Sequence, residues 1–196
     1  MPIRAPGRRV VSDGLVCGID EAGRGPIAGP VTAAAVILPL DFTADMLDDS
    51  KALSASQRRN AASAIMDKAV SWGIGWATHE EIDGMNIHRA TLLAMSRAIN
   101  VMAVKPARII VDGLYCPESG IPGTAIVKGD SAVPEIMAAS ILAKTARDAW
   151  MDMYARREPA YRFETHKGYP TEEHRRIVLA IGPSRIQRLT FSVRRP

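Results

Sequence analysis

Apolar and polar residues along the chain follow two periods, one typical of strands and the other of helices. Short apolar runs predict strands at Leu15–Asp20, Val31–Leu38, Arg108–Asp112 and Ala125–Lys128. In Ser71–Thr78, tryptophans at 72 and 76 alternate with small residues, which predicts a half-buried strand with both rings in the core. The link Glu21–Pro30 contains three glycines and two prolines and is predicted to be a turn.

Apolar residues at helical spacing predict four helices. They run from Ser54 or Ser56 to about Val70, over Asn86–Val104, from Pro134 to about Tyr154, and from Thr171 to near Gly182-Pro183. Strands that alternate with helices indicate an α/β fold.

Composition places the chain among globular proteins of one domain. It has 196 residues, of which 47% are hydrophobic, and no apolar run approaches the roughly 20 residues that cross a membrane. Cys17 and Cys116 form neither a zinc motif nor a disulfide framework, and we interpret them as free thiols in a reducing compartment. We therefore expect a cytoplasmic protein without membrane contact, and a monomer.

Charge is distributed unevenly. The net charge of +4 divides into +5 over residues 147–196 and −1 over residues 1–146. A basic flank beside an acidic body suits a polyanion that is cleaved at a metal centre. The alternative is an ordinary solvated basic surface.

Four acidic residues end predicted strands or follow them closely: Asp20, Glu21, Asp112 and Asp130. Strand ends of one polarity lie together in an α/β sheet, where converging carboxylates repel each other unless cations neutralise them. Ligand sets made only of oxygen favour Mg²⁺ or Mn²⁺. The alternative for a single Asp in this position, such as Asp112 or Asp130, is a turn or capping residue.

Two further patterns are suited to phosphate binding. Gly23-Arg24-Gly25 combines backbone that can approach a ligand closely with a permanent charge. In the predicted helix from Pro134, Ser140, Lys144 and Arg147 share one face, while the apolar residues between them can pack on the sheet. The alternatives are a tight turn with a solvent-facing arginine and a solvent-facing polar stripe.

The order of several motifs resembles the bacterial ribonuclease HII, or type 2 ribonuclease H, family from about Leu15 to Arg188. The motifs are Gly18-Ile-Asp-Glu-Ala-Gly-Arg-Gly-Pro26, Asp49-Ser50-Lys51, Asn86-Ile87, Ile109-Ile-Val-Asp-Gly113, Lys128-Gly-Asp130, Ala138-Ala-Ser-Ile-Leu-Ala-Lys144, His166-Lys-Gly-Tyr-Pro-Thr171 and Gly182-Pro-Ser184. One departure is Gln187, where relatives commonly have histidine.

The resemblance implies a ribonuclease H-like fold, with a central mixed five-stranded sheet flanked by helices and a small helical C-terminal region. It divides the chain into a flexible tail at 1–13, a catalytic domain at 14–155 and a basic helical region at 156–196 packed on the same domain.

The resemblance also implies an endonuclease that uses Mg²⁺ or Mn²⁺, with two ions bound during catalysis. Such an enzyme cuts the RNA strand of RNA–DNA hybrids and incises on the 5′ side of single ribonucleotides embedded in duplex DNA. The products carry 3′-hydroxyl and 5′-phosphate ends. A non-catalytic module that binds RNA–DNA hybrids on the same fold is the alternative.

By matching motif, the resemblance assigns catalysis and metal binding to Asp20, Glu21, Asp112 and Asp130. Asp130 either binds a metal or orients water. Substrate contacts fall to Gly23, Arg24, Gly25, Lys51, Ser140, Lys144 and Tyr169, the last being the family's tyrosine at the junction of ribonucleotide and deoxynucleotide. The histidines at 166 and 174 are interpreted as structural or close to the substrate.

Overall fold

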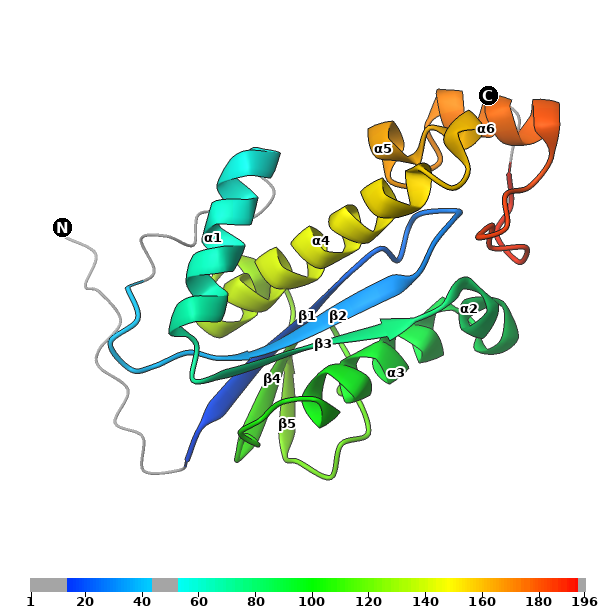
Figure 1. Cartoon of the computed structure of the whole chain (residues 1–196). Coiled ribbons are helices and arrows are strands. Elements are labelled where there is room, and N and C mark those ends of the chain that lie inside the picture. Colours follow the sequence, from blue (N-terminus) through cyan, green and yellow to red (C-terminus); the bar gives the residue numbers. More distant parts are fainter. Residues whose placement is uncertain (1–13, 44–52, 194–196) are drawn as a thin grey trace, which may run out of the picture.

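The computed structural model describes residues 14–43 and 53–193, and Figure 1 shows their arrangement. The strands are β1 (Val16–Ala22), β2 (Val31–Ile37), β3 (Ser71–Ala77), β4 (Arg108–Asp112) and β5 (Gly123–Ile126). The α-helices are α1 (Ala55–Lys68), α2 (His79–Met85), α3 (Ile87–Asn100), α4 (Pro134–Ala155), α5 (Phe163–His166) and α6 (Glu172–Ile181). Two 3₁₀ turns, η2 (Gly129–Ser131) and η3 (Pro159–Tyr161), complete the described elements.

The five strands form one mixed sheet in the order β3-β2-β1-β4-β5. The β3-β2-β1 pairs are antiparallel, whereas β1-β4 and β4-β5 are parallel. One apolar cluster joins the sheet to α3, and a second joins the other face to α1 and α4 (Figure 1). The predicted mixed five-stranded sheet with flanking helices is confirmed.

Several predicted boundaries differ from the structure. β1 continues through Glu21 and Ala22, which pair with β2, so the turn begins at Gly23 and not at Glu21. β5 begins at Gly123, two residues before the predicted start, because its register with β4 pairs Ile109 with Gly123.

Helix ends also differ where polar caps act. α3 ends at Asn100 and not at Val104, because Lys105 donates to the carbonyls of Ile99 and Asn100. The cap of α1 is Ser54, which forms a capping box with Gln57. α2 was not predicted, since seven residues are too few to show a helical period, and its start is fixed by the Thr78–Glu81 capping box.

The prediction that both tryptophans of β3 lie in the core is wrong. Trp72 is 38% exposed and Trp76 is partly exposed, while the opposite face of β3 is fully buried. That face carries Gly73 and Gly75, and a Cβ at Gly75 would lie 2.1 Å from the Ala94 carbonyl oxygen of α3. The small residues therefore face the helix because its backbone lies directly on them.

A similar close approach fixes the first turn of α4 on β1. A Cβ at Gly18 would lie 2.1–2.4 Å from backbone atoms of Glu135 and Ile136. From there α4 runs along β1, so that Ser140 lies beside Asp20 and Arg147 lies beside Gly23. The C-terminal elements η3, α5 and α6 gather near the far end of α4 (Figure 1).

Gly18→Ala is expected to destabilise the fold by about 1–3 kcal/mol, because the methyl group has no space against the α4 backbone. Gly84→Ala in α2 is the matched control, since nothing lies within 4 Å of its Cβ position. In a helix, replacing glycine by alanine is expected to raise the free energy of unfolding by about 0.5–1 kcal/mol. Urea unfolding of both variants measures whether each substitution lowers or raises the stability. Equal stability of the Gly18→Ala and wild-type proteins would contradict the close packing of α4 on Gly18.

Candidate active site

The predicted acids lie at the carboxyl ends of three neighbouring strands. Ile19 of β1 pairs with Val111 of the parallel β4, so Asp20 and Asp112 follow at adjacent positions. Asp130 lies in η2, just after β5. The backbone N–H of Gly129 donates to Asp112 Oδ1 at 2.8 Å, which connects the η2 turn to the end of β4.

The first three acids lie close enough to affect one another electrostatically. Burial, then the charge of Glu21 and, less strongly, that of Asp112, raise the pKa of Asp20 well above its usual value. Burial also raises the pKa of Glu21, against the opposing effect of Arg24 and with a further contribution from Asp112. The site therefore concentrates negative charge that the neighbouring side chains compensate only in part.

Two groups hold the Asp20 carboxylate. The Glu21 backbone N–H donates to Asp20 Oδ1 at 2.7 Å, and the Ser140 hydroxyl of α4 also hydrogen-bonds to this side chain. Ser140 is only 8% exposed. The structure thus places Ser140 against an acid, whereas its predicted contact with a substrate phosphate stays a prediction.

The chemistry of the site fits a hard divalent cation. Within residues 14–43 and 53–193, no three His, Cys, Asp or Glu side chains form a ready-made metal-binding group. Two of the carboxylates have other partners, since Glu21 contacts Arg24 and Asp112 accepts from Gly129. Still, Asp20 is buried, its pKa is raised, and the carboxylates of Glu21 and Asp112 lie nearby. A bound cation would stabilise the ionised form of this group of carboxylates.

The Gly23–Pro30 loop leads directly away from the acids. Arg24 Nη1 lies 3.3 Å from Glu21 Oε1, and the Arg24 side chain is half exposed. Gly23 has φ of +94°, and a Cβ there would lie 2.0 Å from Arg147 Nε, so both backbone conformation and space require glycine. The sequence predicted the turn, and the structure shows that it starts beside the acid pair.

Tyr169 lies beside this loop although 144 positions separate it from Gly25. A Cβ on Gly25 would be 3.9 Å from Tyr169 Cε1. The Tyr169 ring is 38% exposed, with Lys144 Nζ 5.5 Å and the Arg147 guanidinium 5.8 Å from its centroid. The structure therefore brings together residues from three separate sequence patterns: Gly25 of the Gly-Arg-Gly motif, Lys144 and Arg147 of one helix face, and Tyr169.

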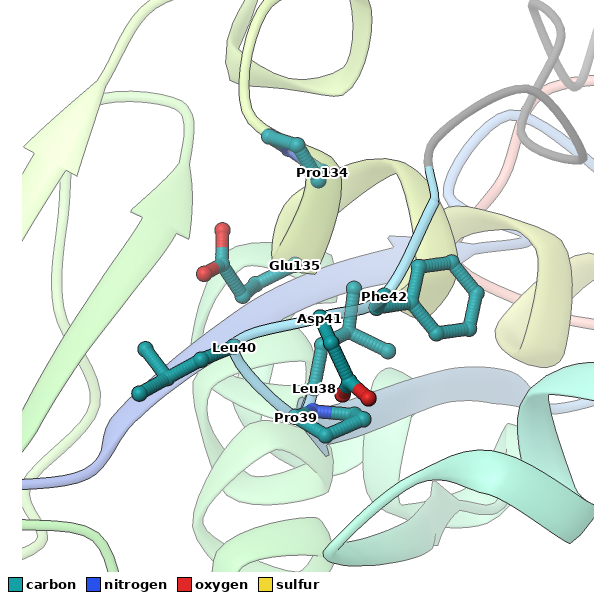
Figure 2. Close-up of a pocket in the computed structure, with 7 residues that line it drawn as sticks. All are labelled: Leu38, Pro39, Leu40, Asp41, Phe42, Pro134 and Glu135. Carbon is teal, nitrogen blue, oxygen red and sulfur yellow. The ribbon is translucent and has the colours of Figure 1, made fainter. Parts of the chain in front are cut away.

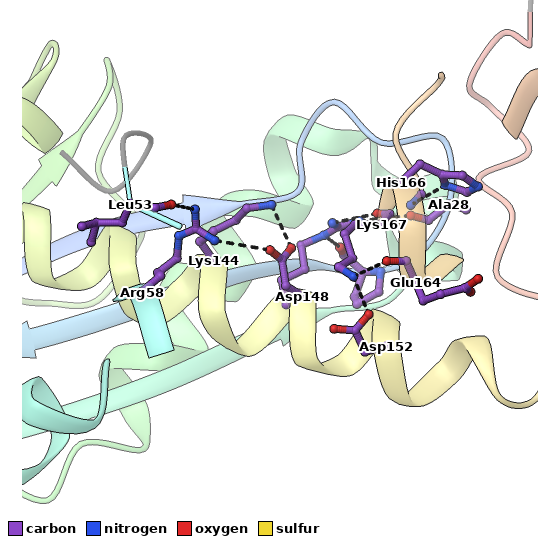
Figure 3. Close-up of polar contacts among 12 residues, drawn as sticks. Ala28, Leu53, Arg58, Lys144, Asp148, Asp152, Glu164, His166 and Lys167 are labelled. Carbon is purple, nitrogen blue, oxygen red and sulfur yellow. Dashed lines mark hydrogen bonds and ion pairs between the residues drawn. The ribbon is translucent and has the colours of Figure 1, made fainter. Parts of the chain in front are cut away.

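Lys144 belongs to a chain of ion pairs that follows α4 (Figure 3). Its Nζ lies 2.8 Å from Asp148 Oδ1, and Arg58 of α1 approaches the other oxygen of Asp148 at 3.8 Å. Further along, Lys167 pairs with Asp152. Lys51, also predicted to contact phosphate, lies outside the described residues, as do Asp49 and Ser50 of the same motif.

Two buried histidines hold the backbone around Tyr169. His166 and His174 stack with ring centroids 4.2 Å apart. His174 Nδ1 donates to the Tyr169 carbonyl at 2.9 Å, and His166 Nδ1 accepts from the Gly168 N–H. Burial lowers the pKa of His174 to about 4, so its ring is neutral at physiological pH. Both histidines are structural here, which was one of their two interpretations.

Two buried arginines are the part of this region that sequence reasoning missed. Arg147 and Arg188 are both 0% exposed, and both donate to carbonyl groups of the Gly23–Pro30 loop. Arg147 was selected only as part of a polar helix face, and Arg188 was named only as the end of the segment that resembles the family. Gln187 also donates to this loop, at the Ile27 carbonyl, 2.9 Å away.

Comparison with known proteins agrees with this architecture. The family model described as Ribonuclease HII matches residues 17–195. A curated protein named Ribonuclease HII from Nitrosospira multiformis is 52% identical over 177 residues, which cover 90% of this chain and 89% of that protein. The chain belongs to the ribonuclease HII family. It is accordingly a ribonuclease H, an endonuclease that hydrolyses RNA in RNA–DNA hybrids.

Solved structures support the fold of this family member. The ribonuclease H2 from Pyrococcus horikoshii superposes with a TM-score of 0.76 at 24% identity, covering 91% of this chain and 94% of that one. Bst-RNase HIII in complex with Mn²⁺ has a TM-score of 0.69 at 20% identity, covering 92% and 68%. At these identities the likeness shows the fold alone, and it matches the ribonuclease H-like α/β fold expected from the motifs.

Other features of this ribonuclease HII lie away from the acids. A pocket of about 410 Å³ is lined by Leu38–Phe42, Pro134 and Glu135, with Leu40 and Phe42 pointing to opposite sides (Figure 2). It contains none of the four acids.

Across the described ranges, no helix has the length and apolarity required to cross a bilayer. Both cysteines are free thiols.

Asp20→Asn is expected to stabilise the metal-free protein by about 1–2 kcal/mol at pH 8, because the substitution removes a poorly compensated buried charge. The pKa of Asp20 is higher in the folded protein than in the unfolded chain, so ionisation of Asp20 destabilises the wild-type fold. This loss of stability begins above the unfolded-state pKa and grows with pH. The stability gained by Asp20→Asn should therefore shrink as the pH falls towards 4. Urea unfolding in the presence of a chelator measures it.

Asp152→Asn is the control, because this exposed acid pairs with Lys167 and its loss should bring no gain. A wild-type protein as stable as Asp20→Asn at pH 8 would contradict the electrostatic description of the site.

Proposed function

We propose that this ribonuclease HII incises on the 5′ side of single ribonucleotides embedded in duplex DNA, in addition to cutting the RNA strand of longer hybrids. The products carry 3′-hydroxyl and 5′-phosphate ends. The reaction uses Mg²⁺ or Mn²⁺ ions held by Asp20, Glu21, Asp112 and Asp130.

The observation that carries this proposal is the position of the Gly23-Arg24-Gly25 loop between the acids and Tyr169. Arg24 contacts Glu21 on one side, and Gly25 approaches the Tyr169 ring on the other. A phosphate bound beside the acids would therefore place the neighbouring ribose against backbone and an aromatic ring. Since the 2′-hydroxyl distinguishes RNA from DNA, a site built this way can recognise one ribonucleotide.

The acids of the chain are arranged for metal-assisted hydrolysis. Two bound divalent ions would supply an activated water and stabilise the leaving oxygen. The Ser140 hydroxyl and the Glu21 N–H orient the Asp20 carboxylate, and the Gly129 N–H orients that of Asp112. Asp130, adjacent to Gly129, completes the set at the end of β5.

The proposed substrate contacts extend from this centre along α4. The half-exposed guanidinium of Arg24 is proposed to bind one phosphate. The ammonium group of Lys144, beside the Tyr169 ring, is proposed to bind another. Lys51 is proposed as a further contact on the basis of its motif. The excess positive charge of residues 147–196 strengthens attraction to the polyanion and makes binding dependent on salt.

Asp20→Asn is expected to lower the cleavage rate at a single ribonucleotide by at least about 10³-fold, since it removes a charged ligand worth several kcal/mol in the transition state. The assay uses a labelled DNA duplex with one ribonucleotide, in Mg²⁺, in Mn²⁺ and in chelator. Asp152→Asn should cut like the wild type.

Residual activity of Asp20→Asn equal to the wild type would refute the assignment of the acids. A wild-type protein that cuts a long RNA–DNA hybrid but does not cut this duplex with either metal would refute the proposed incision at single ribonucleotides, and one that binds both substrates and cuts neither would indicate a non-catalytic binding module.

Tyr169→Ala is expected to reduce cleavage at a single ribonucleotide by about 10- to 100-fold, the loss that corresponds to one stacked base. Cleavage of a long RNA–DNA hybrid should fall less, because that substrate offers many positions at which the RNA strand can be cut. The ratio of kcat/KM for the two substrates measures the preference. Tyr115→Ala is the matched control, because Tyr115 is an exposed tyrosine that packs on His88. An unchanged ratio in Tyr169→Ala would show that the ring does not read the junction.

A further inference from the structure

Arg188 is a fully buried cation whose hydrogen-bond donors all point at one loop. Its guanidinium donates to the backbone carbonyls of residues 23, 24, 26, 29 and 30, at 2.6, 3.1, 2.7, 2.9 and 3.1 Å. An arginine has five N–H donors, and here each is used once. These carbonyls belong to residues 158 to 165 positions earlier in the chain.

Neighbouring groups complete the same pattern. Gln187 Nε2 donates to the carbonyl of Ile27, and Arg147 donates to the carbonyls of Ala28 and Pro30. Every carbonyl from Gly23 to Pro30 except that of Gly25 therefore accepts from one of these three side chains. Burial, and secondly the charge of Arg147, lower the pKa of Arg188 to about 9, against the opposing effect of Asp83, which reflects the cost of burying two cations together.

The direction of these carbonyls determines what the other side of the loop presents. The described peptide bonds are all trans, so the N–H of each residue points away from the carbonyl of the residue before it. Because the carbonyls of Gly23 and Arg24 point at Arg188, the N–H groups of Arg24 and Gly25 point away from it. Gly25 is also the residue that approaches the Tyr169 ring.

We propose that Arg188 is a positioning residue for substrate recognition, which fixes the Gly23-Arg24-Gly25 backbone so that its N–H groups face the ribonucleotide. This inference rests on the proposed function. Arg188 does not itself touch the substrate or the metal ligands. Its effect is to turn a glycine-rich segment, which has many conformations of similar energy, into one prearranged set of donors.

Arg188→Lys tests the proposal, because a lysine has three donors and cannot satisfy five carbonyls. We expect kcat/KM at a single embedded ribonucleotide to fall about 10- to 100-fold, as for other small displacements of positioning groups. The ratio of kcat/KM for this substrate to that for a long hybrid should fall as well. Mn²⁺ affinity, measured by calorimetry without substrate, should match the wild type, since the acids are held by other groups.

Arg185→Lys is the matched control, an exposed arginine three residues away, and should leave all of these quantities unchanged. A folded Arg188→Lys protein with the wild-type kcat/KM and substrate ratio would overturn the proposal. So would equal losses on both substrates together with a loss of Mn²⁺ affinity, because these would indicate general damage to the site. The wild-type protein must cut the single-ribonucleotide duplex for this comparison, so failure of the proposed function would be seen separately.

Hydrogen exchange provides a test that does not depend on how Arg188→Lys folds. It uses the otherwise native protein carrying Asp20→Asn, which keeps the duplex intact. The amides of Arg24 and Gly25 should become protected by a duplex with one ribonucleotide and less so by an all-DNA duplex of the same sequence. Exchange that neither duplex changes would overturn the proposal, since the N–H groups would then not face the substrate.

Discussion

The buried carboxylate of Asp20 is the feature on which the arrangement of this ribonuclease HII depends. Parallel pairing of β1 with β4 places Asp20 next to Asp112, and Glu21 follows in the same strand. Burial and, secondly, the repulsion from Glu21 and Asp112 raise the pKa of Asp20, and the hydroxyl of Ser140 offsets only part of this shift. A fold that keeps such a cluster gives up stability at one place, which is common where catalysis requires concentrated charge. The close contact of α4 with Gly18 supports the strand at that point.

A second set of buried charges is positive, and backbone groups stabilise it. Arg147 and Arg188 donate to backbone carbonyl oxygens of the Gly23–Pro30 loop, while the charges of Asp148 and Asp83 offset only part of the cost of burying them. The peptide dipoles thus take the place of counter-ions. Asp20 and Glu21 directly precede this loop and the arginines bind its carbonyls, so opposite charges lie within a few residues of one another. A substrate phosphate bound at the proposed site would lie between the carboxylates and these cations.

The sequence allowed prediction where the signal is local. Apolar strands followed directly by acids placed Asp112 correctly at the end of β4 and Asp20 near the end of β1, which continues to Ala22, and the motif order identified the family. The tryptophans of β3 were misplaced because hydrophobicity alone does not show that a helix backbone lies against glycines.

What could not be predicted depends on distant contacts. No local pattern indicates that His174 holds the Tyr169 carbonyl or that Arg188 binds carbonyls near the start of the chain. The same is true of Ser140, whose helical face was predicted but whose partner, Asp20, is 120 residues away. Such pairings are decided by the packing of α4 and the C-terminal segment, and they appear only in three dimensions.

The long separation between Arg188 and its loop has a consequence for how the enzyme is made. Synthesis delivers the N-terminal strands first, and domains begin to fold in that order. The acids of β1 and β4 can therefore meet while the carbonyls of residues 23, 24, 26, 27 and 29 still lack the donors of Gln187 and Arg188, because contacts of high sequence separation form late. A nascent chain that has emerged only as far as α6 would hold the acids without the hydrogen bonds from Gln187 and Arg188 to this loop. The loop would then receive the hydrogen bonds of Gln187 and Arg188 only after those residues have been synthesised.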